Sequence, residues 1–464
     1  MISFSNLTFI FRFLPAFLIV FYVAPVKFRT WTLLLGSLIF YAVGSVDSVG
    51  NIKLFPVLLG SVVVNYLFAR AVRGVEGKKK KVLLAFIVMI DAFMLVEFKL
   101  LGQFVDKNLI PIGISFYTFK MISFQADTYN GKIDSKPLFK DVAAYFCMFP
   151  QVVSGPIMRF SDYSDNLELI PGAAKSSKEE IFAHIEDGLK YFVVGLGMKV
   201  LLADHYAMLW KEIGTIGYES ISTPFAWIGA VTYSLQLFYD FWGYSLMSSG
   251  IAVMLGFPFV VNFDHPYSSK SVSEFYRRWH ATLGSWFRDY IYIPMGGSRV
   301  GRIRIIFNLL VVWLVTGFWH GVTLNFILWG LILFVIILCE RFVVSKLPGF
   351  LKSIVGRFNV LILIPLTWVI FAISDAEMLL NYFKRLFPFF GAGIAVNSND
   401  YIKNLGIYGG LLAIGLVLLV PHVFKFFEKH RKNPLIIICL FALFWVSVYS
   451  LANSAGNPFM YFAF

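Results

Sequence analysis

Long apolar runs recur along the whole of this 464-residue chain, and short polar stretches separate them. The runs are continuous rather than alternating, which favours membrane-spanning helices over the strands of a β-barrel. The pattern predicts an all-α polytopic membrane protein with about 11–13 transmembrane helices, some runs being short or glycine- and proline-marked as expected of re-entrant segments. The predicted spans are residues 7–24, 31–46, 54–71, 82–105, 109–125, 142–158, 189–209, 225–242, 245–260, 305–319, 322–338, 361–371, 406–420 and 435–451.

The composition agrees with this pattern. Hydrophobic residues make up 58% of the chain and charged residues 14%, whereas soluble domains carry about a quarter charged residues. The net charge is +13, from 40 basic and 27 acidic residues. The basic residues lie in short loops between predicted spans, which indicates the positive-inside rule and contact with membrane lipid, not with nucleic acid.

Polar loops predict the orientation and one surface helix. Residues 69–81, with four consecutive lysines, and residues 424–432 mark the cytoplasmic side. Residues 171–190 predict a surface helix with Ser177 as its cap and Glu180 at capping-box spacing. We interpret His184 in this helix as a surface histidine.

Residues 274–299 form a dense polar stretch, which holds four arginines, two acids, two tryptophans and a histidine. Ser271 and Glu274 precede it at capping-box spacing, so a helix is predicted to begin near Val272 and to continue through His280. The arginines alone would fit snorkelling to lipid phosphates, and the tryptophans an interfacial belt. Those alternatives do not account for His280 in the same segment.

A second histidine lies within an uncharged stretch. Residues 305–339 hold no charged side chain, and as one straight helix they would extend about 52 Å, well beyond a hydrocarbon core of about 30 Å. A break is therefore predicted near Gly317 and Gly321, on either side of Trp319 and His320. A histidine at such a break fits either a buried core residue or a catalytic group.

The dipeptide Trp-His occurs twice, at residues 279–280 and 319–320, and several chemistries can be excluded for these histidines. The three cysteines form no zinc-ligand pattern, and a metal site would need three or four ligands, so no metal is expected. Neither a GxSxG elbow nor a P-loop is present. The remaining hypothesis is a histidine that acts as general base beside cations that bind an acyl donor. These groups together would catalyse acyl transfer.

Several long motifs resemble one family. The segments are PIGISFYTFKMISFQADTYNG (residues 111–131), FPQVVSGPIMRF (149–160), YSLQLFYDFWGYSLM (233–247), the block from residue 255 to residue 297, GFWHG (317–321) and the closing NPFMYFAF (457–464). In this order they resemble the membrane-bound O-acyltransferases of the alginate O-acetyltransferase type, close to end to end. Two departures are Leu246 at a position where that family has aspartate and Ala372 where it has arginine.

The resemblance implies a single transmembrane domain over residues 1–464, with an arch of helices around a thinned core. It implies that His320 and His280 are catalytic. Residues near them are predicted to bind substrate and donor: Arg278, Trp279, Trp286, Arg288, Asp289, Tyr290 and Trp319.

The implied reaction transfers an acyl group, expected to be acetyl, from a cytoplasmic thioester donor for O-acetylation of an extracytoplasmic polysaccharide. The expected donor is acetyl-CoA, as a substrate, with no cofactor. The expected partner is an extracytoplasmic SGNH-type acetyltransferase, and the expected location is the inner, or cytoplasmic, membrane. Two alternatives remain open: D-alanyl transfer to teichoic acid, and transport of an anionic lipid or glycan precursor.

Overall fold

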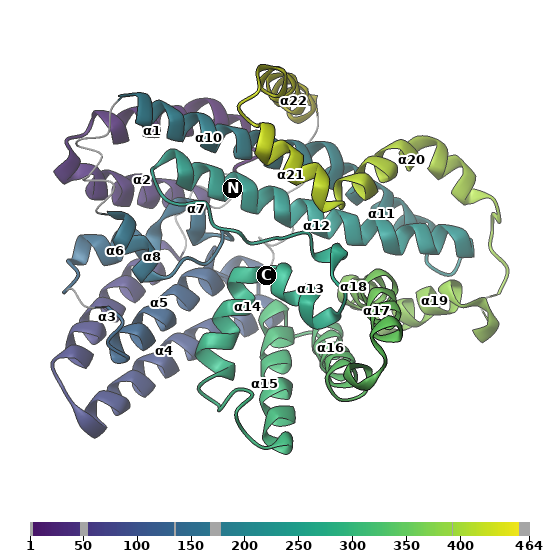
Figure 1. The fold of residues 1–464 in the computed structure, drawn as a ribbon, viewed down its shortest axis with the longest axis horizontal. Helices are drawn as coiled ribbons and strands as arrows, with labels where there is room; N and C mark the ends of the chain where they lie inside the picture. Colours follow the sequence, from purple (N-terminus) through teal and green to yellow (C-terminus); the bar gives the residue numbers. More distant parts are fainter. Residues whose placement is uncertain (1–2, 47–53, 134–135, 168–177, 392, 454–464) are drawn as a thin grey trace. The chain divides into compact units, whose positions relative to one another are not determined.

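The structure is a computed structural model, and it describes residues 3–46, 54–133, 136–167, 178–391 and 393–453. These residues form helices and no β-strand, which confirms the all-α prediction. Figure 1 shows the helices in chain order. Contacts divide the chain into two compact units. Within the described residues, one unit comprises Met1–Gly195 and Tyr244–Val261, and the other comprises Leu196–Gly243 and Asn262–Met460.

The first unit contains the N-terminal helices and parts of two longer ones. Its helices are α1 (Leu14–Val23), α2 (Arg29–Gly44), α3 (Phe55–Arg73), α4 (Gly77–Phe104), α5 (Ile114–Tyr129), α6 (Phe139–Cys147), α7 (Phe149–Val152), α8 (Phe160–Leu167), most of α10 (Lys178–Gly197) and the end of α12 (Thr223–Met254). Polar side chains connect three of these helices. Asn65 of α3 donates to Asp91 of α4 at 2.9 Å, and Gln125 of α5 donates to the Asn65 side chain at 2.9 Å.

The second unit contains both histidines of the Trp-His pairs. It holds the rest of α12 and the helices α11 (Asp204–Ile216), α13 (Val272–Arg278), α14 (Ala281–Phe287), α15 (Arg302–His320), α16 (Leu324–Phe342), α17 (Gly349–Phe358), α18 (Ile364–Ala372), α19 (Ala376–Leu386), α20 (Asp400–Leu418), α21 (Pro421–His430) and α22 (Pro434–Asn453). Turns of π-helix lead into or extend several helices, at Phe9–Phe13, Met198–Ala203, Arg288–Tyr292 and Asn359–Leu363.

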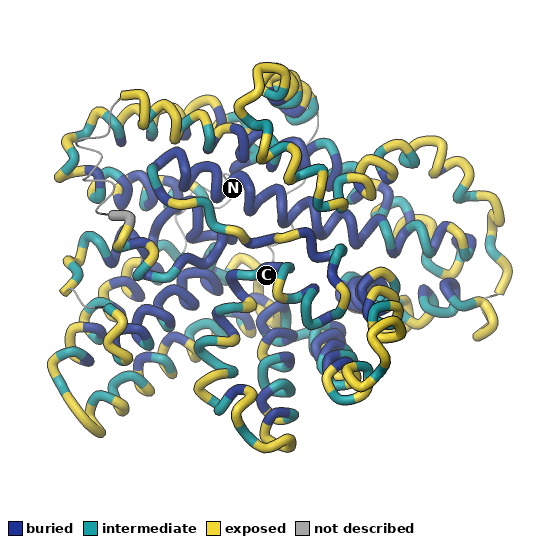
Figure 2. The backbone as a smooth tube through the Cα atoms, viewed as in Figure 1, coloured by how far each residue is buried: buried dark blue, intermediate teal, exposed yellow. Residues whose placement is uncertain are grey.

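Within the described residues, eight helices are long and apolar enough to cross a membrane by length and composition. Several predicted runs form shorter pieces instead. Residues 142–158, for example, divide between α6, α7 and a loop because Phe149-Pro150 begins a new turn. Burial differs strongly between spans (Figure 2): α20 and α22 are mostly exposed, as lipid-facing helices would be, whereas much of α12 is buried.

Lys199 occupies the centre of a buried ion-pair cluster in the second unit. Its Nζ lies 2.6 Å from Asp204 Oδ1 and 2.9 Å from Asp240 Oδ1 of α12. Burying one lysine costs free energy unless carboxylates compensate its charge. The two aspartates supply that compensation and join the turn of π-helix to α12.

Two sequence predictions about polar segments have different outcomes. His184 is exposed, as predicted. The predicted cap Ser177 lies outside the described residues, and α10 is described from Lys178 onward. The closing motif at residues 457–464 also lies outside them.

Candidate active site

The helix predicted to run through His280 ends before it, so that prediction was wrong. The cap was correctly predicted, since the Ser271 hydroxyl accepts a hydrogen bond from the Glu274 backbone N–H at 3.0 Å. However, α13 stops at Arg278, and His280 adopts φ 47° and ψ 51° before α14 begins at Ala281. This left-handed conformation is uncommon outside glycine.

Long-range backbone contacts hold the break at His280. The Ala281 N–H donates to the Asn262 carbonyl at 2.8 Å, and the Asp264 N–H donates to the Arg278 carbonyl at 3.0 Å. The segment before α13 therefore runs beside the segment after it. A strained residue persists where its surroundings over-determine its conformation, and the helical periodicity of residues 272–287 did not reveal those surroundings.

The Asn262 side chain fixes the tautomer of His280. The Asn262 Oδ1 accepts from the Thr282 backbone N–H at 3.3 Å and from the Thr282 hydroxyl at 2.8 Å. Because a backbone N–H only donates, the shared atom must be the amide oxygen. The Nδ1 of His280 lies 3.0 Å from that oxygen, so Nδ1 carries the proton and Nε2 carries the lone pair of the ring.

Burial keeps the His280 imidazole neutral. Its exposed fraction is 4%, and burial lowers the pKa of His280 to about 3. The ring packs edge-on against Phe241 of α12, with 4.6 Å between centroids. A neutral imidazole with a basic Nε2 can accept a hydrogen bond or a proton.

His320 lies at the break that the sequence predicted. It is the last residue of α15, and Gly321 follows in extended conformation before α16 begins at Leu324. Gly317 stays helical and serves close packing instead, because a Cβ there would lie 2.6 Å from the Phe326 carbonyl oxygen. The uncharged stretch therefore folds into two tightly packed helices with His320 between them.

Aromatic rings surround His320. Its centroid lies 4.5 Å from Trp319, 5.1 Å from Trp329 and 5.0 Å from Phe371. The exposed fraction of His320 is 6%. The imidazole is thus held by α15, α16 and α18 in apolar surroundings, where electrostatic interactions are stronger than in water.

The structure brings the two Trp-His pairs together. The His280 centroid lies 6.2 Å from that of Trp319, the ring that also packs against His320. Trp279 is connected to the same region through two ring contacts. It lies 5.1 Å from Trp368, and Trp368 lies 5.6 Å from Trp329 between centroids. Four of the nine predicted site residues, the two tryptophans and two histidines of these pairs, therefore join one aromatic cluster.

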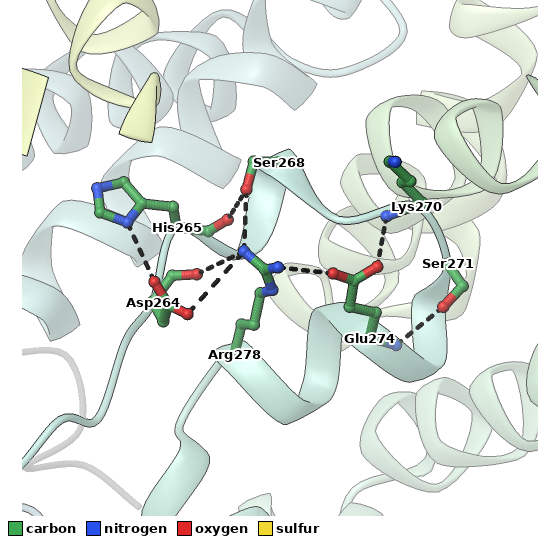
Figure 3. Close-up of polar contacts among 7 residues, drawn as sticks. All are labelled: Asp264, His265, Ser268, Lys270, Ser271, Glu274 and Arg278. Atoms are coloured by element: carbon green, nitrogen blue, oxygen red, sulfur yellow. Dashed lines mark hydrogen bonds and ion pairs between the residues drawn. The ribbon is translucent and has the colours of Figure 1, made fainter. Parts of the chain in front are cut away.

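Arg278 belongs instead to a polar network around α13 (Figure 3). Its guanidinium pairs with Glu274 at 2.7 Å and approaches Asp264 at 4.0 Å and the Ser268 hydroxyl at 3.3 Å. The Glu274 carboxylate also accepts from the Lys270 N–H at 2.9 Å. This network stabilises the turn that precedes α13.

The remaining predicted residues follow α14. Trp286 is buried and contacts Tyr290 at 5.4 Å. Arg288 pairs with Asp289 at 2.7 Å, and the Arg288 side chain is 62% exposed. Trp286, Tyr290, Arg288 and Asp289 thus form two contacting pairs at the end of α14 and in the turn that follows it.

Sequence reasoning missed five residues that contact the histidines: Asn262, Phe241, Phe326, Trp329 and Phe371. It also missed Trp368, which packs against Trp329. The only signal for them was their presence in apolar or family-like segments. Nothing in their spacing relative to His280 or His320 marks them.

Comparison with known proteins identifies the family. The family model of MBOAT, the membrane-bound O-acyltransferase family, matches residues 80–350. The chain belongs to the membrane-bound O-acyltransferase family. As a member, it is a multi-pass membrane protein and an O-acyltransferase.

The chain is also similar to individual proteins that act on bacterial polymers according to their names. The chain is 33% identical to the probable alginate O-acetylase AlgI of Pseudomonas aeruginosa, over 83% of this chain and 75% of the relative. It is 29% identical to the peptidoglycan O-acetyltransferase of Helicobacter pylori, over 91% and 86%. A teichoic acid D-alanyltransferase of Streptococcus thermophilus is 26% identical over 47% of this chain and 54% of the relative.

Proposed function

We propose that this O-acyltransferase moves an acetyl group from a cytoplasmic thioester donor, acetyl-CoA, for O-acetylation of an extracytoplasmic polysaccharide. The whole chain acts as one transmembrane domain in the inner membrane. An extracytoplasmic SGNH-type acetyltransferase partner receives the group for the polymer. The names of the AlgI and peptidoglycan O-acetyltransferase relatives support a polysaccharide acceptor and an acetyl group.

One observation carries the chemical part of the proposal. Two buried histidines, one at the break between α13 and α14 and one at the end of α15, pack against one tryptophan, Trp319. A base in a dry, apolar site needs a fixed orientation, and both rings are held by contacts on several elements. A histidine that served only to fill the core would not need a second buried histidine against the same tryptophan.

His320 acts as the general base in this proposal. Its imidazole takes the proton from the acceptor hydroxyl as the oxygen attacks the thioester carbonyl. The tetrahedral intermediate collapses with cleavage of the C–S bond, and the thiolate leaves with the proton that the imidazole returns. The products are the O-acetyl ester and the free thiol.

His280 orients the reactants through its basic Nε2, since Asn262 holds the proton on Nδ1. Trp319 and Trp279 form apolar walls that exclude water from the thioester. Donor binding in this proposal involves the exposed Arg288 and its half-buried partner Asp289. Trp286, Tyr290 and Arg278 contribute to the same binding.

The decisive experiment replaces the base. We expect His320→Ala to reduce polymer O-acetylation by about 10²- to 10⁴-fold, with unchanged protein level and membrane insertion. Release of free thiol from acetyl-CoA by membranes containing the variant measures the step directly. Wild-type acetylation by correctly inserted His320→Ala would defeat the assignment.

D-alanyl transfer to teichoic acid is the second candidate, favoured by the similarity to a teichoic acid D-alanyltransferase. Cells given labelled acetate and labelled D-alanine separate the two reactions. Acetate ester in exopolysaccharide supports our proposal, whereas alanine ester in wall polymer supports the alternative.

A further inference from the structure

We infer that Glu340 is a positioning residue that fixes α13, and with it His280, relative to His320. The inference rests on the proposed function, because it gives Glu340 a role in the arrangement of the two histidines.

The helix α13 is too short to be stable by itself. It has seven residues, Val272–Arg278, and isolated helices shorter than about 12–15 residues are marginal in water. Its first N–H groups lack acceptors within the helix. The Ser271 hydroxyl satisfies one of them, the N–H of Glu274.

Glu340 of α16 accepts hydrogen bonds from the N–H groups of the first two residues of α13. Its Oε1 accepts from the Val272 N–H at 2.7 Å, and its Oε2 accepts from the Ser273 N–H at 3.1 Å. The Ser273 hydroxyl adds a bond of 3.2 Å to Oε2, and the Asn359 amide approaches Oε1 at 3.4 Å. One carboxylate thus binds the N-terminus of α13 with both oxygens.

The location of Glu340 makes this arrangement specific. Its exposed fraction is 7%, and a buried carboxylate costs free energy unless hydrogen bonds and opposite charge compensate it. The positive end of the helix dipole of α13 supplies part of that compensation. An apolar residue would pack at this position in α16 at lower cost, but it could not bind α13.

The same helix, α16, also contacts the His320 side of the site. Trp329, three turns before Glu340, lies 5.1 Å from His320 and 6.4 Å from Tyr276 of α13 between ring centroids. Gly330 allows close contact with α15, because a Cβ there would lie 2.6 Å from the Trp313 carbonyl oxygen. Therefore α16 is packed against the helix that ends in His320 while Glu340 holds the helix that leads to His280.

Loss of the Glu340 carboxylate would remove the hydrogen bonds between α16 and α13 but not the packing of α16 against α15. The α15–α16 pair would keep His320 in place, whereas α13 would lose two N-terminal hydrogen bonds and could shift along α16. His280 lies two residues beyond the end of α13, so a shift of α13 would move its imidazole. A displacement of about 1 Å in a catalytic arrangement can reduce the rate by about 10²-fold.

The first measurement compares the kinetics of Glu340→Ala, Glu340→Gln and Glu377→Ala with those of the wild type. Glu377 is an exposed acid in the first turn of α19 and serves as the matched control. We expect Glu340→Ala to lower kcat at least tenfold with less than a twofold change in KM for acetyl-CoA. Glu340→Gln retains one acceptor oxygen and should recover part of kcat, and Glu377→Ala should match the wild type.

The second measurement reports position independently of activity. Spin labels at Arg277→Cys in α13 and Arg341→Cys in α16, both exposed positions, give a distance distribution between the helices. The three natural cysteines, Cys147, Cys339 and Cys439, are replaced by alanine in all samples. We expect the distribution to broaden or shift in Glu340→Ala and to remain narrow in Glu377→Ala.

The outcomes separate the two proposals. An unchanged distance distribution in Glu340→Ala, or a changed distribution with wild-type kcat, overturns the positioning role. A loss of activity that only parallels a loss of folded protein in the membrane also overturns it. His320→Ala is measured in the same membranes, and full activity of that variant refutes the proposed chemistry whatever Glu340 does.

Discussion

The Nδ1 of His280 lies 3.0 Å from the side-chain oxygen of Asn262, a residue 18 positions earlier in the chain. The Thr282 N–H donates to the same oxygen, which identifies it as an acceptor and places the imidazole proton on Nδ1. This relationship connects a strained backbone position to a defined protonation state. It also leads to the first prediction.

Replacing Asn262 should impair catalysis more than folding. We expect Asn262→Ala to lower kcat about 10- to 100-fold, because the lost bond to a buried group is worth about 1–3 kcal/mol and releases the tautomer of His280. The measurement is the rate of thiol release by membranes with matched amounts of protein. Thr282→Val, which removes a different bond to the same oxygen, should cost less. Equal losses in the two variants would contradict a specific role for the His280 tautomer.

The neutral state of His280 predicts a pH dependence of stability. Burial lowers the folded-state pKa to about 3 from 6.5, so below pH 6.5 the unfolded chain binds a proton that the folded chain does not. The contribution of this group to stability is therefore complete above pH 6.5 and decreases as the pH falls toward 3.

Thermal unfolding of purified protein between pH 7 and pH 4 tests this sign. We expect the melting temperature of the wild type to fall toward acid more steeply than that of His280→Gln. Parallel curves for the two proteins would show that His280 does not titrate in the predicted way.

Close helix packing at Gly317 predicts a steric effect. A Cβ at this position would lie 2.6 Å from the Phe326 carbonyl oxygen, so Gly317→Ala should separate α15 from α16 and destabilise the protein by about 1–3 kcal/mol. Gly410→Ala in α20 is the matched control, because nothing lies within 4 Å of a Cβ there. Thermal unfolding in detergent measures both, and an equal melting temperature for the two variants would contradict the packing argument.

Removal of the exposed Arg288 side chain is predicted to weaken donor binding without lowering the stability of the protein. Exposed ion pairs contribute little to folding, and the Arg288 side chain is 62% exposed. We expect Arg288→Ala to leave the melting temperature unchanged and to raise KM for acetyl-CoA severalfold. Kinetics at varied donor concentration measure this, with the exposed Arg277→Ala in α13 as control. An unchanged KM would remove Arg288 from the donor site.

The sequence by itself determined the helical class of the fold, the cap at Ser271 and the family. Continuous apolar runs predict helices because helices satisfy the backbone hydrogen bonds within lipid, and helices without β-strands make up the regular structure of the described residues. The cap Ser271 and the break after His320 follow from local chemistry, a hydroxyl at helix-cap spacing and a glycine after a span. The order of long motifs was enough to identify an O-acyltransferase.

Only the tertiary structure decided how the two Trp-His pairs meet. His280 leaves the helix that periodicity predicted because Asn262 and Asp264, earlier in the chain, bind the backbone on either side of it. Glu340 binds α13 from 68 residues away. Trp329 of α16 contacts His320, and Trp368 of α18 packs against Trp329. Local periodicity encodes which face of a helix is apolar, but not which distant side chain that face will meet, so these contacts arise only when the helices pack.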